Sequence, residues 1–341
     1  MSPQNRAAWL MKKQDKIQIV GDAPYHMPEA DEIVIKTMAI AINPADIIIQ
    51  SRGIIVDTYP AILGCDAAGV VEEVGSNVEN FKAGDRVIGT AQPLPGGNYK
   101  HSGFQQYVVL KLPQVAKIPD STKFTDGTVL PLGILASSSC LFHKETLALE
   151  MPPSQGGKGK TVLIWGASGS LGCCGVQLAA AAGYEVFAVA SRKNHELVKS
   201  LGATQAFDQN ELNLIDNIVT ALKGRDCVGA FDAISKEDTL HALCDILHKS
   251  GGRPFVASIL PGAESFAKHN VTVKSNLSCT KPLMTAVSKH IWRVFLEPAL
   301  ESGAFQCAPP ADIVGHGLED VQKCCDVLAQ GVSAKKVVLE L

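Results

Sequence analysis

Hydrophobic positions follow one pattern in the first part of the chain and a different one in the middle. In the first part, roughly 120 residues, Ile and Val recur in short runs that Gly and Pro interrupt. Residues 31–44 alternate and are rich in Ile and Val, which is typical of a strand. Residues 68–78 predict two short strands around a Gly-Ser-Asn turn, and residues 81–89 predict a turn followed by another strand. This spacing favours a compact, mostly antiparallel β unit.

From residue 161 the pattern becomes an alternation of strands and helices. The apolar run 161–165 is typical of a strand buried on both faces, and the small and apolar residues 171–183 predict a helix after it. Residues 184–191 predict a second strand, and a helix follows with Asn194 as its N-cap. The alternation continues through residues 230–260. This order predicts a parallel, doubly wound sheet.

The last part of the chain mixes helix and strand patterns. After about Cys279 we expect one long amphipathic helix, then the segment 311–317, a helix over 318–331 and a strand over 335–341. A short strand at the very end suggests that the chain returns to the β unit.

The composition is that of a folded protein without a strongly charged surface. Hydrophobic residues make up 46% and charged residues 19%, which excludes a disordered chain. With 31 Lys and Arg against 34 Asp and Glu there is no basic excess, so we expect no nucleic-acid partner. Apolar runs are too short to span a membrane, and residues 1–16 hold no apolar signal segment. The ten cysteines include no Cys-x-x-Cys pair, so we expect reduced thiols and a cytoplasmic location.

The most informative motif is the glycine-rich segment Gly166–Gly172, which joins the predicted strand 161–165 to the predicted helix. Gly169 would let the backbone approach a pyrophosphate closely, and Gly172 would let the helix pack tightly against the strand. The free N–H groups at the helix N-terminus would receive the phosphate charge. The alternative is a tight turn without a ligand. We predict a dinucleotide site formed by Gly166, Ser168, Gly169, Ser170, Leu171 and Gly172.

The end of the second predicted strand indicates which dinucleotide binds. An acidic residue there would hold the ribose 2′-hydroxyl of NAD, whereas a cationic one accommodates the 2′-phosphate of NADP. The sequence has Ser191, Arg192 and Lys193 and no acidic residue at this point. A hydroxyl can donate to phosphate, and the two cations supply charge. We therefore predict NADPH as the cofactor; the alternative is a solvated turn before the helix.

The order of short motifs along essentially the whole chain resembles that of the medium-chain dehydrogenase/reductase superfamily. Besides the glycine-rich turn, the motifs that carry the resemblance are Asn-Pro-Ala-Asp at 43–46, the run 59–71, Val-Gly at 74–75, Gly-Asp-Arg-Val-Ile-Gly at 84–89 and Lys-Val-Val at 336–338. Within the superfamily, the sequence is most similar to the zinc-independent quinone oxidoreductases and enoyl reductases. More narrowly, it resembles the stand-alone, trans-acting (toxD-like) enoyl reductases of fungal polyketide pathways.

The resemblance implies an α/β fold with a GroES-like, mostly β domain plus a doubly wound Rossmann domain. The domains implied are residues 1–127, the GroES-like catalytic domain, and residues 128–277, the NADP-binding Rossmann domain. Residues 278–341 would return to the catalytic domain. The resemblance also implies an active site in the cleft between the domains.

Metal binding is the next question that the resemblance raises, because zinc-dependent members would carry a Cys near Asn43 and a His-Glu pair at Cys65 and Asp66. Asn43 is a poor zinc ligand, and Cys65 and Asp66 lack a third partner, whereas a catalytic zinc needs three protein ligands. A structural zinc site would need four cysteines after Gly89, and residues 90–104 hold none. We expect no bound zinc; the alternative is a zinc alcohol dehydrogenase with altered ligands.

The absence of zinc would constrain the mechanism, because hydrogen-bond donors must then stabilise negative charge on the substrate oxygen. That requirement suits conjugate addition, in which NADPH delivers hydride to the β-carbon of an α,β-unsaturated carbonyl. The resemblance suggests Asn43 and Ser138 as catalytic contacts, with Ser138 at the start of a helix on the nicotinamide side. The backbone of Ile259 and Leu260, at a strand end, should line the nicotinamide.

The proton donor is not identified by the sequence. Residues 47–49 are all Ile where many fungal relatives have a Lys, and residues 51–55 lack the Tyr of some enoyl reductases. Two alternatives stay open: an NADPH:quinone oxidoreductase, and an NADPH-binding protein with little turnover. The resemblance also implies a small-molecule or carrier-bound unsaturated carbonyl as substrate, a polyketide synthase as a candidate partner, and a monomer or homodimer.

Overall fold

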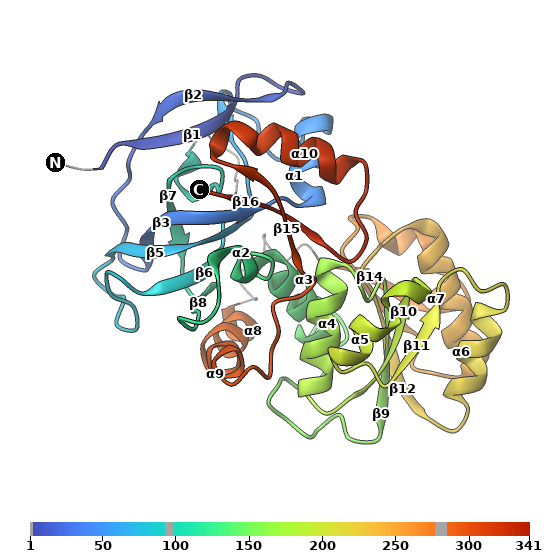
Figure 1. Ribbon diagram of the computed structural model, residues 1–341. Helices are drawn as coiled ribbons and strands as arrows, with labels where there is room; N and C mark the ends of the chain where they lie inside the picture. The colour runs from blue at the N-terminus through green and yellow to red at the C-terminus, as the bar shows by residue number, and fades with distance from the viewer. Residues whose placement is uncertain (1–2, 93–97, 277–284) are drawn as a thin grey trace. The chain divides into compact units, whose positions relative to one another are not determined.

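The chain forms two compact units in a computed structural model that describes residues 3–92, 98–276 and 285–341 (Figure 1). Unit 1 consists of Met1–Leu132 with Leu296–Leu341, and unit 2 consists of Gly133–Phe295. We expected divisions after residues 127 and 277. The first division instead falls within one continuous helix, α3 (Pro131–Phe142), and residues 277 and 278 lie outside the described residues.

Unit 1 is built from two sheets. Its strands are β1 (Asn5–Leu10), β2 (Ile17–Ala23), β3 (Glu32–Ala41), β4 (Ala61–Ile62), β5 (Asp66–Val74), β6 (Arg86–Thr90), β7 (Tyr107–Lys111), β8 (Val115–Lys117), β15 (Ala311–His316) and β16 (Lys336–Glu340). The larger sheet has the order β15-β16-β3-β5-β6-β8, with β7 also paired to β3, and the smaller sheet has the order β2-β1-β4. β16 pairs antiparallel with β3, so the end of the chain shares a sheet with its beginning.

The central strand β3 serves two hydrophobic cores of unit 1. Ile33 and Ile35 pack into one cluster, whereas Ile40 and Ile42 pack into the other. The pairing of β3 with β5 shifts register between Thr37 and Ala39. This irregularity is a bulge with one extra residue on β3, so the alternation of apolar side chains changes there from odd to even positions.

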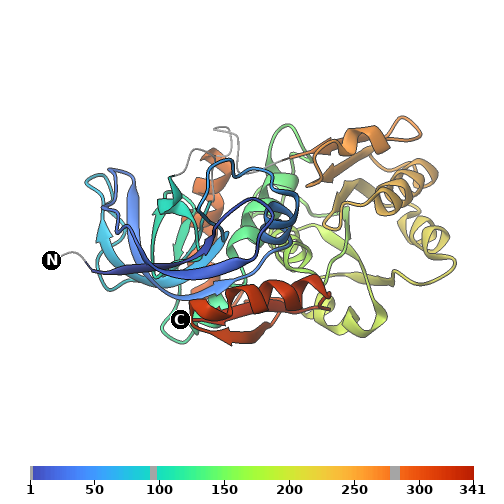
Figure 2. The same cartoon turned by 90° about the horizontal axis from the view of Figure 1, so that it is seen from above.

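Short helices surround the sheets of unit 1. They are α1 (Pro44–Arg52), η1 (Tyr99–His101), α2 (Phe124–Gly127), α9 (Glu297–Glu301), η6 (Leu318–Asp320) and α10 (Val321–Ala329). The C-terminal helix α10 lies beside α1 and over β15 and β16, as both views show (Figure 1 and Figure 2). The N-terminal and C-terminal parts of the chain therefore build this unit together.

Unit 2 is a six-stranded parallel sheet with helices on both faces. Its strands are β9 (Lys160–Trp165), β10 (Glu185–Ala190), β11 (Gln205–Asp208), β12 (Asp226–Asp232), β13 (Phe255–Ser258) and β14 (Thr272–Ser275), in the order β11-β10-β9-β12-β13-β14. Its helices are the later part of α3, α4 (Ser170–Ala181), η2 (Arg192–Asn194), α5 (His195–Ser200), α6 (Leu214–Leu222), α7 (Glu237–Ser250), η3 (Ala263–Phe266), α8 (Thr285–Lys289) and η5 (His290–Leu296). α4 and α5 cover one face, and α6 and α7 cover the other (Figure 1). The predicted fold class, a mostly β domain plus a doubly wound Rossmann domain, is confirmed.

Some local predictions were wrong. After the turn at 75–77 no second strand forms. β11 and α6 were not predicted. In the described part of the expected long helix, α8 and α9 are separated by the π-helical stretch η5.

Two further expectations concern cysteines and membranes. Nine cysteines lie in the described residues and none of them is joined in a disulfide bond, and Cys279 lies outside this part. Within the described ranges, no helix combines the length and apolar character required to cross a membrane.

Candidate functional site

The glycine-rich turn lies at the carboxyl end of β9, directly before α4. Gly166 leaves the strand with a φ of 74°, and the N–H groups of Gly166 and Ala167 both donate to the carbonyl of Val189 in β10, at 3.0 Å each. Gly169 is the N-cap of α4, so no side chain caps the helix. Its first N–H groups therefore point toward the place where an anion would bind.

The glycines of the turn differ in what surrounds them. A Cβ at Gly172 would lie 2.2 Å from the carbonyl oxygen of Gly166 and 2.5 Å from the Cα of Ala167. The packing of α4 against the turn is therefore by itself sufficient to require glycine at 172. A Cβ at Gly169 would meet only the carbonyl oxygen of Gly166, at 3.4 Å. The space over Gly169 is open, as a close approach of a pyrophosphate requires.

Two further side chains, those of Asn194 and Ser137, hold this turn. The Nδ2 of Asn194 donates to the Oγ of Ser168 at 3.1 Å, which ties the turn after β9 to the turn after β10. We expected Asn194 to cap the next helix, but its side chain makes no capping hydrogen bond. The Oγ of Ser137 in α3 donates to the carbonyl of Leu171 at 2.7 Å.

The residues predicted to bind a 2′-phosphate follow β10. Ser191 is partly buried and precedes η2, where Arg192 and Lys193 are exposed. One Nη of Arg192 lies 3.4 Å from the Oε1 of Glu211, and its side chain is 77% exposed. An exposed pair of this kind is weak, so the guanidinium can turn to a phosphate. Glu211 was not predicted as a partner of Arg192.

Ile259 and Leu260 directly follow β13, at the carboxyl edge of the same sheet as the glycine-rich turn. Their N–H groups are already engaged, because Ile259 donates to the Oγ of Ser235 and Leu260 donates to the Oγ of Ser258, both at 3.1 Å. Neither serine was singled out from the sequence.

In unit 1, Asn43 belongs to a buried ionic cluster. Its Nδ2 donates to the Oδ2 of Asp66 at 2.8 Å, and its Oδ1 accepts a hydrogen bond from the ammonium of Lys336. Lys336 also lies 3.0 Å from the Oδ2 of Asp66, and the side chains of Lys336 and Asp66 are 4% and 0% exposed. The other oxygen of Asp66 accepts from the N–H of Leu132, at the start of α3, at 2.6 Å. Both the Nδ2 and the Oδ1 of Asn43 are therefore hydrogen-bonded to other side chains of the protein.

Asp46 is the second carboxyl group of this cluster. It accepts hydrogen bonds from the N–H groups of Asn43 at 2.8 Å and Gly64 at 3.2 Å, and from the thiol of Cys65 at 3.5 Å. Burial raises the pKa of Asp46 to about 7, and the charge of Asp66 adds to this, while the hydrogen bond from Asn43 opposes it. Burial also raises the pKa of the Cys65 thiol well above its usual value.

These residues do not fit a zinc ion. The ammonium of Lys336 lies between the oxygen atoms of Asn43 and Asp66, so a dication there would meet a like charge. In the part of the chain that the structure describes, no group of three or more His, Cys, Asp or Glu side chains is arranged to hold a metal.

Ser138 does not lie where we expected it. It falls in the second half of α3 rather than at a helix start, and its Oγ donates to the carbonyl of Leu135 at 3.2 Å. The residue is fully buried. Because the hydroxyl is turned back onto its own helix, the structure gives no support to our assignment of Ser138 as a catalytic residue.

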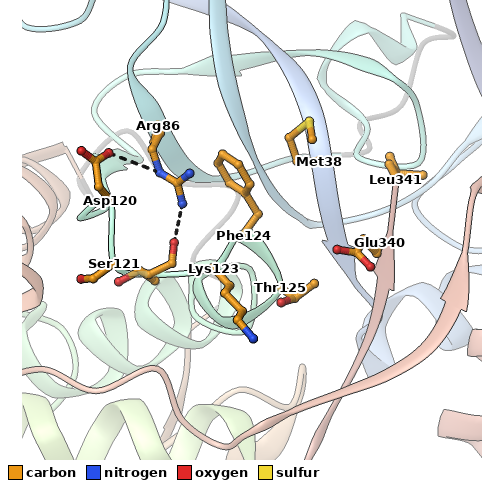
Figure 3. Close-up of a pocket in the computed structure, with 10 residues that line it drawn as sticks. Met38, Arg86, Asp120, Ser121, Lys123, Phe124, Thr125, Glu340 and Leu341 are labelled. Atoms are coloured by element: carbon orange, nitrogen blue, oxygen red, sulfur yellow. Dashed lines mark hydrogen bonds and ion pairs between the residues drawn. The ribbon is translucent and has the colours of Figure 1, made fainter.

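One cavity of unit 1, of about 310 Å³, contains none of the predicted site residues. In Figure 3, the guanidinium of Arg86 lies over the ring of Phe124, 4.1 Å from its centroid, and faces Asp120. Glu340 lies on the other side of the cavity (Figure 3). Acidic and basic groups are mixed here, so the lining favours no one class of ligand.

Comparisons with known proteins agree with this architecture. Residues 29–120 match the family model of the alcohol dehydrogenase GroES-like domain, and residues 170–298 match that of the zinc-binding dehydrogenases. The chain is 40% identical to dehydrogenase orsE of Emericella nidulans, over 99% of both chains. It is 38% identical to trans-enoyl reductase himH of Aspergillus japonicus, over 99% of this chain and 97% of that one.

Among solved structures, the CurK enoyl reductase superposes with a TM-score of 0.75 at 19% identity, over 99% of both chains. At such an identity the likeness concerns the fold. The family models, the relatives and the two-unit architecture agree. The chain therefore belongs to the medium-chain dehydrogenase/reductase superfamily, within its enoyl reductase branch, and is an oxidoreductase.

Proposed function

We propose that this chain is a zinc-independent, NADPH-dependent reductase of carbon–carbon double bonds conjugated to a carbonyl group. Bound NADPH would supply a hydride to the β-carbon of the substrate. The observation that carries the proposal is the edge of the sheet in unit 2, where open space over Gly169 follows β9 and the exposed cations Arg192 and Lys193 follow the neighbouring strand β10. The trans-enoyl reductases among the relatives favour an enoyl substrate.

Different residues of the chain would bind different parts of the cofactor. The backbone of Gly166–Leu171 and the N-terminus of α4 would hold the pyrophosphate, with Ser168 and Ser170 as hydroxyl donors. Ser191, Arg192 and Lys193 would hold the 2′-phosphate, because charged donors to phosphate are stronger than neutral ones. The hydrogen bond between Asn194 and Ser168 would keep the two phosphate sites in register.

Zinc independence rests on the cluster in unit 1. Lys336 supplies a positive charge beside Asn43 and Asp66, so the cluster needs no metal for charge balance. Purified protein incubated with excess zinc and then dialysed should retain far less than one zinc ion per chain by elemental analysis. One zinc ion per chain would overturn zinc independence.

A substrate panel under NADPH tests the reaction itself. We expect steady NADPH oxidation with enoyl thioesters, product reduced at the double bond, and little oxidation with quinones. Turnover of quinones alone would favour an NADPH:quinone oxidoreductase, whose fold this chain shares with the Pseudomonas syringae enzyme at a TM-score of 0.72. Tight NADPH binding without oxidation by any substrate would favour an NADPH-binding protein.

The acyl carrier of the substrate is a separate part of the proposal. A stand-alone enoyl reductase would accept its substrate from a polyketide synthase, bound to a carrier protein. The same enoyl group should then turn over faster on a carrier protein than on pantetheine. Equal rates on the two would argue against a synthase partner and for a free small-molecule substrate.

A further inference from the structure

Exposed apolar side chains gather on and directly after α1 in unit 1. Ile48, Ile54 and Ile55 are between 40% and 49% exposed. Three of the ten exposed large apolar side chains that the structure describes thus lie within this short segment. Within the described residues, none of the three belongs to a hydrophobic core cluster of unit 1. An exposed apolar patch of this kind is typical of a binding surface.

The backbone of Ile55 has a strained conformation. Its φ is +71°, and the N–H of Val56 donates across it to the carbonyl of Ile54 at 2.8 Å. This is the rare, strained form of the γ-turn, and a β-branched residue is a genuine outlier there. Such strain is found mostly at functional sites. The conformation therefore indicates a function for the exposed side chain of Ile55.

The turn between β1 and β2 is attached to the same end of α1. The Nε2 of Gln14 in this turn donates to the carbonyl of Ser51 at 2.9 Å. A Cβ at Gly53, the C-cap of α1, would lie 2.4 Å from the Cε of Lys13, so the Lys13 side chain lies across the end of the helix. Lys13 therefore shares this end of α1 with Arg52, which is in its last turn.

The two cations at the end of α1 are not neutralised by neighbours. In the described part of the chain, the exposed side chains of Lys13 and Arg52 form no hydrogen bond or ion pair, whereas Lys12 in the same turn lies 3.9 Å from Asp15. The C-terminal end of a helix carries about half a negative charge. Two cations exceed this charge, so the end of α1 keeps positive charge that can bind an anion.

An exposed face of α1 leads from these cations to the start of the helix. Pro44, Ile48 and Arg52 are spaced four residues apart, so they share one face, and all three are exposed. With nine residues, α1 is about 13 Å long, and it begins directly after Asn43. A flexible chain of slightly greater length could therefore be held by its charged end at Arg52 and reach Asn43 with its other end.

Phosphopantetheine has the chemistry that this surface requires. It carries a phosphate at one end, a dimethyl group next to the phosphate, and the acyl thioester at the other end. Extended like a peptide with the same number of bonds, it spans about 15 Å from phosphate to sulfur. This length matches the distance along α1, and charged donors from Lys and Arg form strong hydrogen bonds to phosphate.

We propose, on the basis of the function proposed above, that the end of α1 and the turn between β1 and β2 bind the phosphopantetheine arm of a carrier protein. Lys13 and Arg52 bind the phosphate. Ile54 and Ile55 pack against the dimethyl group, and Ile48 contacts the arm nearer to its sulfur. The thioester then lies at the N-terminal end of α1.

The first test measures binding of the arm without turnover. Calorimetric titration compares 4′-phosphopantetheine with pantetheine, which lacks the phosphate, for the full chain and for Lys13→Gln with Arg52→Gln. The unchanged chain should bind phosphopantetheine about tenfold more tightly than pantetheine, and the variant should bring this ratio close to one. The control, Lys199→Gln with Lys223→Gln, removes two exposed charges in unit 2 and should keep the ratio.

The outcome that overturns the inference is a ratio near one in the unchanged chain, no binding of either compound, or a ratio that persists in the folded variant. Each of these outcomes leaves the proposed function intact, because the measurement involves neither NADPH nor the double bond.

The apolar part of the site is tested with Ile55→Gly, which accepts the positive φ and should fold. It should weaken phosphopantetheine and pantetheine equally, by severalfold, because both contain the dimethyl group. Ile313→Ser, at an exposed position of β15, is the control and should weaken neither. Unchanged affinity for both compounds in Ile55→Gly overturns the assignment of the isoleucines.

The second test identifies the source of the arm. Values of kcat/KM are measured for one enoyl group on a carrier protein and on CoA. Lys13→Gln with Arg52→Gln should lower the value for the carrier-bound substrate about tenfold. A loss confined to the CoA thioester overturns the assignment to a carrier protein. No NADPH oxidation by the unchanged chain with any enoyl substrate overturns the proposed function itself.

Discussion

Gly169 and Gly172 lie three residues apart, and an added methyl group meets opposite surroundings at the two positions. At Gly172 it would collide with backbone at 2.2 Å, so Gly172→Ala should lower the free energy of unfolding by about 1–3 kcal/mol. At Gly169 it would extend into open space, so Gly169→Ala should cost less than about 1 kcal/mol, the usual difference at an N-cap. Because that space would receive the pyrophosphate, Gly169→Ala should weaken NADPH binding about tenfold or more.

Urea unfolding measures the first effect and calorimetric titration with NADPH measures the second. Each variant acts as the control for the other, because both add one methyl group to the same turn. A large loss of stability in Gly169→Ala would contradict the conclusion that the space over Gly169 is open. Unchanged NADPH affinity in this variant would show that the pyrophosphate lies elsewhere.

Lys336 and Asp66 form the most deeply buried ion pair that the structure describes, with side chains 4% and 0% exposed. Lys336→Met keeps much of the side-chain volume and removes the charge, which leaves Asp66 buried without its cation. Removal of one partner from such a pair typically costs about 3–5 kcal/mol, so urea unfolding should report a loss of this size.

The neighbouring lysine provides a matched control for this prediction. Lys335 is 54% exposed at its side chain and pairs with Asp312 at 3.1 Å on the surface. Lys335→Met should change the free energy of unfolding by less than about 1 kcal/mol. If the two variants lose the same amount, the burial of Lys336 has no energetic consequence, and its role in the cluster must be revised.

At the scale of elements, the turn that joins β10 to α5 is expected to set the choice of cofactor. Replacement of Arg192 and Lys193 together by Gln removes both charges from η2 and leaves the strand and the helix in place. NADPH binding should weaken by about ten- to hundredfold, as expected from the loss of charge-assisted hydrogen bonds, and NADH binding should hardly change. Titration of both cofactors into the variant measures the ratio.

The control for this element is a pair of exposed lysines elsewhere in unit 2. Lys199→Gln with Lys223→Gln removes the same amount of charge away from the turn. This variant should keep the preference for NADPH at the same ionic strength, because distant surface charges are screened. Equal weakening of NADPH and NADH in the Arg192 and Lys193 variant would mean that the turn does not bind the 2′-phosphate.

Elements with strong local patterns were predictable from the sequence. The strand 161–165, the glycine-rich turn and the helix after it form one continuous local signal, and they correspond to β9 and α4. The resemblance to the superfamily implied that Ser138 and the serines on either side of it lie at a helix start. They lie inside α3, where burial against other elements outweighs the preference of hydroxyls for caps, and sequence periodicity does not reveal this.

At the scale of the whole molecule, the cluster in unit 1 depends on contacts between distant parts of the chain. Asn43 and Lys336 are 293 positions apart and meet because β16 pairs with β3. The residue types at Asn43, Cys65 and Asp66 raised the question of a metal, and nothing in the sequence near them indicates the ammonium that contacts Asn43 and Asp66. The same holds for Ser235 and Ser258, which meet only because β12 and β13 are neighbours.

Asp46 links this cluster to the pH dependence of global stability. Its pKa is about 7 in the folded chain, above the ordinary value of 3.8 for an aspartate, so the folded state binds the proton more tightly than the unfolded state. The resulting stabilisation is complete below about pH 4 and is lost as pH rises through 7. Asp46→Asn cannot titrate, so the free energy of unfolding of the unchanged chain should fall relative to that of the variant between pH 4 and 8. The difference should be on the order of 4 kcal/mol, measured by urea unfolding at each pH. Parallel pH profiles for the two proteins would mean that Asp46 titrates normally and that its burial is offset by its three hydrogen-bond donors.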